Sequence, residues 1–260
     1  MIKKIGLEII NINALKISST FLKKKLRDYG VTIIRNQNID NRKLVKFSKL
    51  LGKPIIHNFS KNISKYPEIM TIIKEKNDKK MFGGTWHSDS TYLEKPPRYT
   101  ILYPKTLPGK NLGGTKFACM INAYNLLNKK TKKTLEKIYV CNSSKKKLYK
   151  YRKTQENNKH KKEIIAYHSI VKRISSEIKA LYYSPGHIKS LSVLNSKILK
   201  PKKNKTLISE IESVLLDRDN IFTHQWEKGD LVIWDNYRVI HCPINNFRNK
   251  KRVMLRISVK

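Results

Sequence analysis

The stretch GGTWHSDSTYLEKPP, residues 83–97, places a histidine and an aspartate two positions apart between a glycine pair and a proline pair. On an extended strand successive side chains alternate between the two faces, so His87 and Asp89 are predicted to point the same way. A neutral imidazole and a carboxylate on one face form half of a divalent metal site. The same spacing also suits a hydrogen-bonded pair in a surface turn, so a further ligand has to decide between the two interpretations.

A second histidine near the C-terminus supplies that ligand, in GDLVIWDNYRVIHCP, residues 229–243. His241 stands near the end of a hydrophobic run, where a buried strand is expected. With His87 and Asp89 it completes a two-histidine, one-carboxylate triad, which leaves coordination positions open and is typical of non-haem Fe(II) oxygenases. Cys242 follows this ligand but faces the opposite way on a strand, so a small buried residue is expected there.

Two arginines follow on an alternating strand, RVMLRISV, residues 252–259. Arg252 and Arg256 are four positions apart and therefore share one face, while the aliphatic side chains of Val253, Leu255 and Ile257 share the other. One interpretation is a half-exposed edge strand with two solvated arginines. The other is a cavity that holds a dicarboxylate and an acidic substrate, because arginine pairs with carboxylates through two parallel hydrogen bonds.

Charge is the most unusual feature of the composition: 56 basic and 19 acidic side chains in 260 residues give a formal net charge of +37. Lysine accounts for 45 of the basic residues and is spread along the whole chain, together with frequent isoleucine and asparagine. Because these three residues share AT-rich codons, we interpret the charge as coding drift. A specific nucleic-acid partner would call for arginine-rich patches interleaved with aromatics or a recognised module, and neither is present. Polyanion binding is the alternative that the charge favours.

The cysteines and the apolar segments point to a cytoplasmic protein without a membrane partner. Three cysteines without CxxC spacing do not form a disulfide framework and suit a reducing compartment. The N-terminal segment MIKKIGLEIININ is interrupted by polar residues, which argues against a signal peptide. No stretch approaches the ~18 consecutive apolar residues of a membrane span.

Short strands outnumber helices in the pattern of apolar and turn-forming residues. Helices are expected over residues 18–29, 41–52, 123–138 and 205–217, and strands over residues 31–36, 69–75, 98–104, 114–120, 178–184, 230–235, 238–243 and 252–259. The polar, lysine-rich residues 141–163 are interpreted as a loop, a lid or an insertion. These elements predict a mainly β fold, a sandwich or barrel core with flanking helices.

Five segments in this order resemble the taurine dioxygenase (TauD/TfdA-like) family of Fe(II)- and 2-oxoglutarate-dependent oxygenases. They are VTIIRNQNIDNRKLVKFSKLLGKP (31–54), FGGTWHSDSTYLEKPPRYTILYPKTLP (82–108), GGTKFACMINAYNLL (113–127), WDNYRVIH (234–241) and KRVMLRISV (251–259). The resemblance implies a double-stranded β-helix, or jelly roll, formed by residues 1–260 as a single domain. It also implies a small-molecule substrate, and because family members commonly form dimers or larger oligomers, a homo-oligomer stays open.

The resemblance assigns roles to individual residues. His87, Asp89 and His241 would bind Fe(II) and carry the catalysis, while Thr115 and Arg252 would hold the far carboxylate of 2-oxoglutarate. Arg256 corresponds to a second arginine that contacts the co-substrate or an acidic substrate. His57 corresponds to a substrate-contacting histidine. Ser60 and Gly83 replace a tyrosine and an asparagine of the taurine pocket, so a substrate other than taurine is expected, with Gly83 leaving room for it.

The expected reaction is hydroxylation of an unactivated C–H bond with O2, releasing succinate and CO2. Desaturation or cyclisation at the same site is an alternative, as is a catalytically silent relative that serves as a binding module. The chain departs from the family at Thr115, which follows its glycines without the usual aspartate, and at Arg238, which is displaced by one position. His160, His168, His187 and His224 have no partner at metal spacing and are expected to be structural or surface residues.

Overall fold

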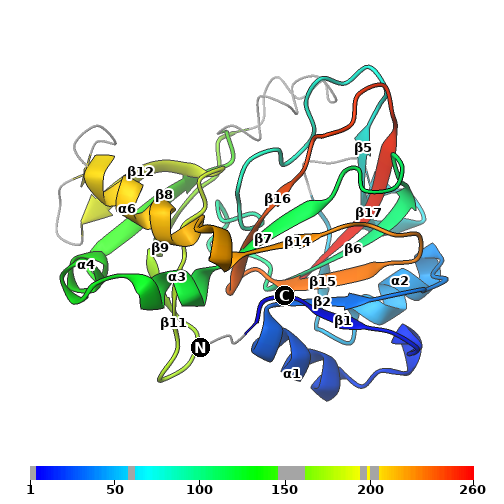
Figure 1. Cartoon of the computed structure of the whole chain (residues 1–260), viewed down its shortest axis with the longest axis horizontal. Coiled ribbons are helices and arrows are strands. Elements are labelled where there is room, and N and C mark those ends of the chain that lie inside the picture. The colour runs from blue at the N-terminus through cyan, green and yellow to red at the C-terminus, as the bar shows by residue number, and fades with distance from the viewer. Residues whose placement is uncertain (1–3, 58–61, 146–161, 194–197, 200–204) are drawn as a thin grey trace.

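The three-dimensional structure, a computed structural model, describes residues 4–57, 62–145, 162–193, 198–199 and 205–260. It contains a large β-rich body and a smaller lobe of strands and helices beside it (Figure 1). Within the described ranges, no helix is both long enough and apolar enough to cross a membrane.

The larger sheet of the body has the strand order β1-β2-β15-β6-β17-β5-β4, and β3 pairs with β17 beside this path. Its strands are β1 (Leu7–Ile9), β2 (Val31–Ile34), β3 (Pro54–Ile55), β4 (Asn62–Ile63), β5 (Tyr66–Lys74), β6 (Tyr99–Thr106), β15 (Leu231–Asp235) and β17 (Arg252–Val259). All pairings except β1 with β2 are antiparallel.

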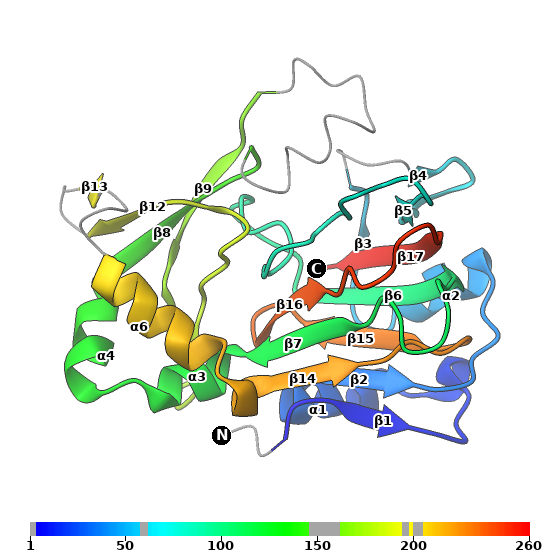
Figure 2. The same ribbon diagram turned by 45° about the horizontal axis from the view of Figure 1, so that its top comes forward.

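A second sheet of three strands, in the order β14-β7-β16, packs over the first (Figure 2). Its strands are β14 (Ile221–His224), β7 (Thr115–Cys119) and β16 (Val239–Pro243). The rings of Phe117 and Trp234, one from each sheet, meet at 5.5 Å between centroids in the core. This pair of sheets is the jelly roll, which confirms the mainly β fold class that the sequence predicted.

Two helices cover the outer face of the larger sheet, α1 (Ser19–Tyr29) and α2 (Asn41–Ser48). The N-cap hydroxyl of Ser18 accepts a hydrogen bond from Phe21 N, and Gly30 ends α1 with a φ of 72°. The predicted helix over 41–52 is too long, because the chain leaves α2 after Ser48 through two tight turns.

Within the described ranges, the smaller lobe contains a four-stranded sheet, a hairpin and three helices. Its elements are β8 (Ile138–Ser143), β9 (Ile165–Ser169), β12 (Ile188–Val193), β13 (Ile198–Leu199), β10 (Val171–Arg173), β11 (Lys179–Leu181), α3 (Met120–Leu126), α4 (Lys129–Leu135) and α6 (Lys205–Leu215), with short 3-10 turns η1 (Ala14–Lys16) and η3 (Arg218–Asn220) elsewhere. The sequence did not predict β8, β9 or β12. It also predicted one helix over 123–138, which is instead broken where Asn128 caps the start of α4.

The lysine-rich loop expected over residues 141–163 is wrong at its start. Residues 141–143 belong to β8, where they pair with β9 and β12, and residues 146–161 lie outside the described residues. The polar Asn142 is buried in this strand because its side-chain oxygen accepts a hydrogen bond from Thr91 Oγ1 at 3.1 Å. From the sequence alone, a buried strand whose polar side chain is hydrogen-bonded in the interior is therefore mistaken for a loop.

The half-exposed edge strand considered for residues 252–259 is also wrong. Strand β17 runs between β5 and β6, and all eight of its residues are buried. Leu255 and Ile257 face the core under α1 and α2, while Met254 belongs to the core between the two sheets. Arg252 and Arg256 line a pocket inside the jelly roll.

Candidate metal centre and co-substrate pocket

The histidine–aspartate segment does not form the regular strand that the sequence predicted. His87 is extended only in an isolated bridge with His241, in which each backbone N–H donates to the other carbonyl, at 3.0 and 2.8 Å. The chain then turns at Ser90, whose φ of 51° is left-handed. Residues opposite each other in such a bridge have neighbouring side chains, so the bridge itself brings the two histidines together.

The side chains of His87, Asp89 and His241 converge, with one potential ligand atom of each lying within 4.8 Å of the others. Asp89 Oδ1 is 3.7 Å from His87 Nε2 and 3.8 Å from His241 Nε2. All three residues are buried. A hydrogen bond to the backbone fixes the orientation of the His87 ring: its Nδ1 lies 2.7 Å from the carbonyl oxygen of Thr85 and must donate to it. Its Nε2 therefore carries the lone pair that a metal ligand requires.

The protonation states of the cluster suit a cation. Burial raises the pKa of Asp89, but Arg256, the two histidines and a hydrogen bond from Thr100 outweigh it and hold the pKa well below its ordinary value. Burial and the neighbouring His87 lower the pKa of His241 well below its ordinary value. An ionised carboxylate and neutral imidazoles are the forms in which these side chains bind metal.

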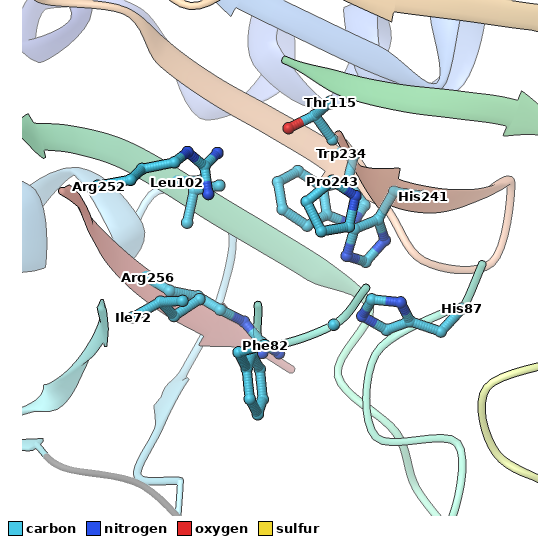
Figure 3. Close-up of a pocket in the computed structure, with 11 residues that line it drawn as sticks. Ile72, Phe82, His87, Leu102, Thr115, Trp234, His241, Pro243, Arg252 and Arg256 are labelled. Atoms are coloured by element: carbon cyan, nitrogen blue, oxygen red, sulfur yellow. The ribbon is translucent and has the colours of Figure 1, made fainter. Parts of the chain in front are cut away.

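A pocket extends from the two histidines of this cluster to Arg252. Figure 3 shows the two histidine rings at one end and the guanidinium of Arg252 at the other. About 410 Å³ of empty space lies within the pocket, part of it open to solvent. Its lining consists of Ile72, Phe82, Gly83, His87, Leu102, Thr115, Trp234, His241, Pro243, Arg252 and Arg256.

Arg252 is buried, and no carboxylate of the described residues forms an ion pair with it. Neither its Nε nor its Nη2 has a hydrogen-bond acceptor among the residues that the structure describes. Burial alone lowers its pKa to about 10, so the side chain is still charged at neutral pH. Thr115 lines the same pocket, and its hydroxyl accepts a hydrogen bond from Trp226 Nε1 at 3.0 Å. A buried guanidinium with unsatisfied donors fits a carboxylate, and the triad at the other end fits Fe(II).

Arg256 differs from Arg252 because it has a carboxylate partner. Its Nη2 lies 3.1 Å from Asp89 Oδ1 and also donates to Ser258 Oγ at 3.1 Å. The side chain lines the pocket near the triad (Figure 3). Its charge therefore acts on the metal ligand as well as on the space where a substrate would lie.

The two other predicted substrate residues have different positions. Gly83 lines the pocket with a φ of 73°, and a Cβ there would lie 2.9 Å from His87 Cε1. The left-handed backbone and the adjacent His87 ring therefore both favour glycine at this position. They do so independently of any space that the glycine leaves for a substrate. His57 is half-buried, and the described residues that line the pocket do not include it. Ser60 lies outside the described residues.

The smaller lobe forms hydrogen bonds with residues 86–93, the segment that carries His87 and Asp89, which the sequence did not reveal. Ser184 Oγ accepts a hydrogen bond from Ser88 N at 3.0 Å, and Gly186 N donates to the carbonyl of Trp86 at 2.9 Å. The Nε2 of His168 lies 2.8 and 3.0 Å from the carbonyls of Thr91 and Leu93.

The remaining histidines have structural surroundings where the structure describes them. His187 is buried, with its ring centroid 6.0 Å from that of His87 and 5.2 Å from that of Tyr92. His224 is buried with its Nε2 3.1 Å from Asp230 Oδ2. His160 lies outside the described ranges. These positions agree with the structural interpretation of His168, His187 and His224.

A two-histidine, one-carboxylate cluster inside a jelly roll, with an arginine at the far end of its pocket, defines a class of protein: the non-haem iron dioxygenases that use 2-oxoglutarate and O2. The comparison with protein families agrees, because residues 3–258 match the family described as taurine catabolism dioxygenase TauD, TfdA family. The chain belongs to this family.

Relatives of known activity share a quarter of the sequence. The alpha-ketoglutarate-dependent sulfonate dioxygenase of Saccharomyces cerevisiae is 25% identical over an alignment of 262 positions, which covers 93% of this chain and 61% of the yeast protein. The chain therefore spans less than two thirds of that relative. The alpha-ketoglutarate-dependent sulfate ester dioxygenase of Pseudomonas putida is 24% identical over 89% of this chain and 77% of its own length. The crystal structure of a taurine dioxygenase from Burkholderia xenovorans has a TM-score of 0.78 at 20% identity, covering 98% of this chain and 87% of that one.

Proposed function

We propose that this chain is an Fe(II)- and 2-oxoglutarate-dependent dioxygenase that hydroxylates an unactivated C–H bond of a small anionic molecule and releases succinate and CO2. The observation that carries the proposal is the buried Arg252, whose unsatisfied guanidinium shares one pocket with the His87, Asp89 and His241 cluster. A dicarboxylate that reaches from the metal to Arg252 would satisfy both ends of this pocket. The match of residues 3–258 to one family supports a single catalytic unit.

Each residue of the pocket has a defined task in this proposal. His87, Asp89 and His241 would hold the iron, which supplies the oxidising chemistry when bound. Arg252 would fix the far carboxylate of 2-oxoglutarate, and Thr115 would offer its hydroxyl beside it. The apolar side chains among the lining residues limit the access of water to the reacting groups.

The substrate class follows from the second arginine. Arg256 is buried, positively charged and close to the triad, so an anionic group on the substrate would be attracted to this side of the pocket. The relatives named above act on sulfonates and sulfate esters, which are anions of this kind. We therefore infer an alkyl sulfonate or an alkyl sulfate ester as the class to test first.

The test has two stages. Anaerobic titration of the metal-free protein with Fe(II) and 2-oxoglutarate should produce the visible charge-transfer band of the chelate, and Arg252→Ala should weaken it. Succinate release is then measured in O2 with sulfonates, sulfate esters and uncharged analogues of equal chain length. Product masses distinguish hydroxylation, which adds one oxygen, from desaturation or cyclisation, which removes two hydrogens. A folded wild type without the band would instead support a silent binding module.

A further inference from the structure

The two carboxylate oxygens of Asp89 have different surroundings. Oδ1 faces the two histidines and Arg256, at 3.7, 3.8 and 3.1 Å. Oδ2 points away from them and accepts a hydrogen bond from Thr100 Oγ1 at 2.6 Å. That distance is typical of a hydroxyl that donates to an ionised carboxylate, a hydrogen bond roughly twice as strong as one between neutral groups.

The direction of this hydrogen bond is set by two buried neighbours of Thr100. The indole Nε1 of Trp234 can only donate, and it donates to Asn236 Oδ1 at 2.9 Å. The amide group of Asn236 is thereby oriented, and its Nδ2 donates to Thr100 Oγ1 at 2.9 Å. Because the threonine oxygen already accepts one proton there, its own proton is directed to Asp89 Oδ2.

The sheet holds this chain of hydrogen bonds in place. Thr100 in β6 is the register partner of Trp234 in β15, so the two side chains come from adjacent central strands. Asn236 is fixed through its backbone, where its N–H donates to Arg98 O at 2.7 Å and its carbonyl accepts from Ser88 Oγ at 2.7 Å. Thr100, Asn236 and Trp234 are all fully buried or nearly so. Water therefore cannot readily replace the missing donor if the hydroxyl is removed.

We propose that Thr100 is a positioning residue that holds Asp89 as a one-oxygen ligand, with Oδ1 directed to the metal and Oδ2 retained by the hydroxyl. This role rests on the proposed metal site. A carboxylate free to turn could present both oxygens to the cation and occupy a further coordination position. With Oδ2 held by Thr100, the protein contributes three donor atoms, and three positions of an octahedral ion stay available for 2-oxoglutarate and O2.

Two substitutions at this position separate the hydroxyl from the volume of the side chain. Thr100→Val keeps the shape and removes the donor, whereas Thr100→Ser keeps the donor. The matched control is Thr32→Val: Thr32 is also buried, on strand β2 at the other side of β15, and its hydroxyl has no hydrogen-bond partner in the described part of the chain. Far-UV circular dichroism and the thermal midpoint establish that each variant is folded.

The probe is Co(II), added to the metal-free proteins while its visible d–d bands are recorded. Thr100→Val should bind Co(II) about 10- to 100-fold more weakly, because mutation of a residue that hydrogen-bonds a metal ligand typically lowers metal affinity by that factor. Its d–d bands should also change in position or intensity, because the ligand geometry changes. Thr100→Ser should have the wild-type spectrum and an affinity within about threefold of wild type, which is a clearly smaller change than the 10- to 100-fold loss expected for Thr100→Val. Thr32→Val should match the wild type in both.

Thr100→Val with the affinity and spectrum of the wild type would overturn the role of Thr100 and leave the proposed function standing. Failure of Thr100→Ser to restore the spectrum, or an equal change in Thr32→Val, would also overturn it, because the hydroxyl would then not be the cause. A folded wild type that binds no Co(II) would overturn the proposed metal site itself, and the role of Thr100 with it.

Discussion

Two aspartates are equally buried beside the turn that contains Asn236, yet their pKa values shift in opposite directions. Asp89 exposes 2% of its surface and Asp235 exposes 1%. Burial raises the pKa of both carboxyls. The pKa of Asp89 nevertheless ends well below its ordinary value, whereas the pKa of Asp235 ends above it.

The difference lies in the neighbours and not in the depth. Asp89 has a guanidinium nitrogen of Arg256 at 3.1 Å and the Thr100 hydroxyl at 2.6 Å. Asp235 has two arginines, Arg98 and Arg238, but its contacts with them are 3.4 Å long and the side chain of Arg98 is 44% exposed. Short, well-aligned donors offset the cost of burying a charge, and longer contacts with a solvated partner do so only in part. We expect the first carboxylate to serve as a ligand and the second to hold the turn.

The comparison predicts its largest effect for a matched pair of substitutions, Asp89→Asn and Asp235→Asn. Asp89→Asn should remove detectable Co(II) binding, an effect larger than the roughly 100-fold that outer-shell changes produce. Asp235→Asn should keep an affinity within about threefold of wild type, because it touches no ligand. Co(II) titration of the folded, metal-free proteins measures both.

The same pair should differ in the same order when the free energy of unfolding is measured in urea at pH 7. Asp89→Asn removes the carboxylate partner of the buried Arg256, so it should lower that free energy by about 3–5 kcal/mol. Asp235→Asn should change it by less than about 1 kcal/mol, because burial already disfavours the ionised carboxyl that it removes. Loss of Co(II) binding in both variants would contradict the division into a ligand and a structural carboxylate.

The two pocket arginines extend the comparison to a second, smaller effect. Arg256→Met leaves Asp89 as an uncompensated buried charge, so it should lower the unfolding free energy of the metal-free protein by about 3–5 kcal/mol. Arg252 has no carboxylate partner among the described residues, so Arg252→Met should leave this free energy unchanged or raise it. Urea denaturation without metal or co-substrate tests both. An equal loss in the two variants would mean that Arg252 has a partner in the resting protein.

The stabilisation that 2-oxoglutarate provides checks the role of Arg252 independently. In the wild type loaded with Co(II), 2-oxoglutarate should raise the thermal midpoint because it binds only the folded state. In Arg252→Met this increase should disappear, even though the metal remains bound.

The sequence carried the metal ligands but not their supports. His87 and Asp89 are two positions apart, and His241 closes a hydrophobic run, so local patterns with one distant partner predict the triad. Thr100 and Asn236 are 136 positions apart, and nothing local marks either as a neighbour of Asp89. Only the register of β6 against β15 brings them together.

The four-stranded sheet of the smaller lobe escaped prediction for a related reason. Its strands carry polar side chains such as Asn142 at buried positions, where long-range hydrogen bonds with the metal-binding segment satisfy them. Patterns of alternating polarity predict strands whose polar side chains face water, and therefore assign such a strand to a loop. Gly83 is a similar case, since the sequence shows a missing side chain but not the His87 ring that a Cβ at this position would meet.

The smallest effect tests the sign of the charge difference directly, through the pH dependence of stability. A carboxyl whose folded-state pKa lies above its unfolded value stabilises the folded protein at low pH, and this stabilisation is lost as the pH rises through the folded pKa.

For Asp235, whose folded pKa lies above 3.8, the unfolding free energy of wild type minus that of Asp235→Asn should increase as the pH falls from 7 to 4. The increase should be about 1.4 kcal/mol for each pH unit that separates the two pKa values. Other titrating groups cancel in the difference, and urea denaturation at each pH measures it. A decrease towards pH 4 would mean that Arg98 and Arg238 hold Asp235 ionised as firmly as Arg256 holds Asp89, and the contrast between the two carboxylates would then rest on the metal alone.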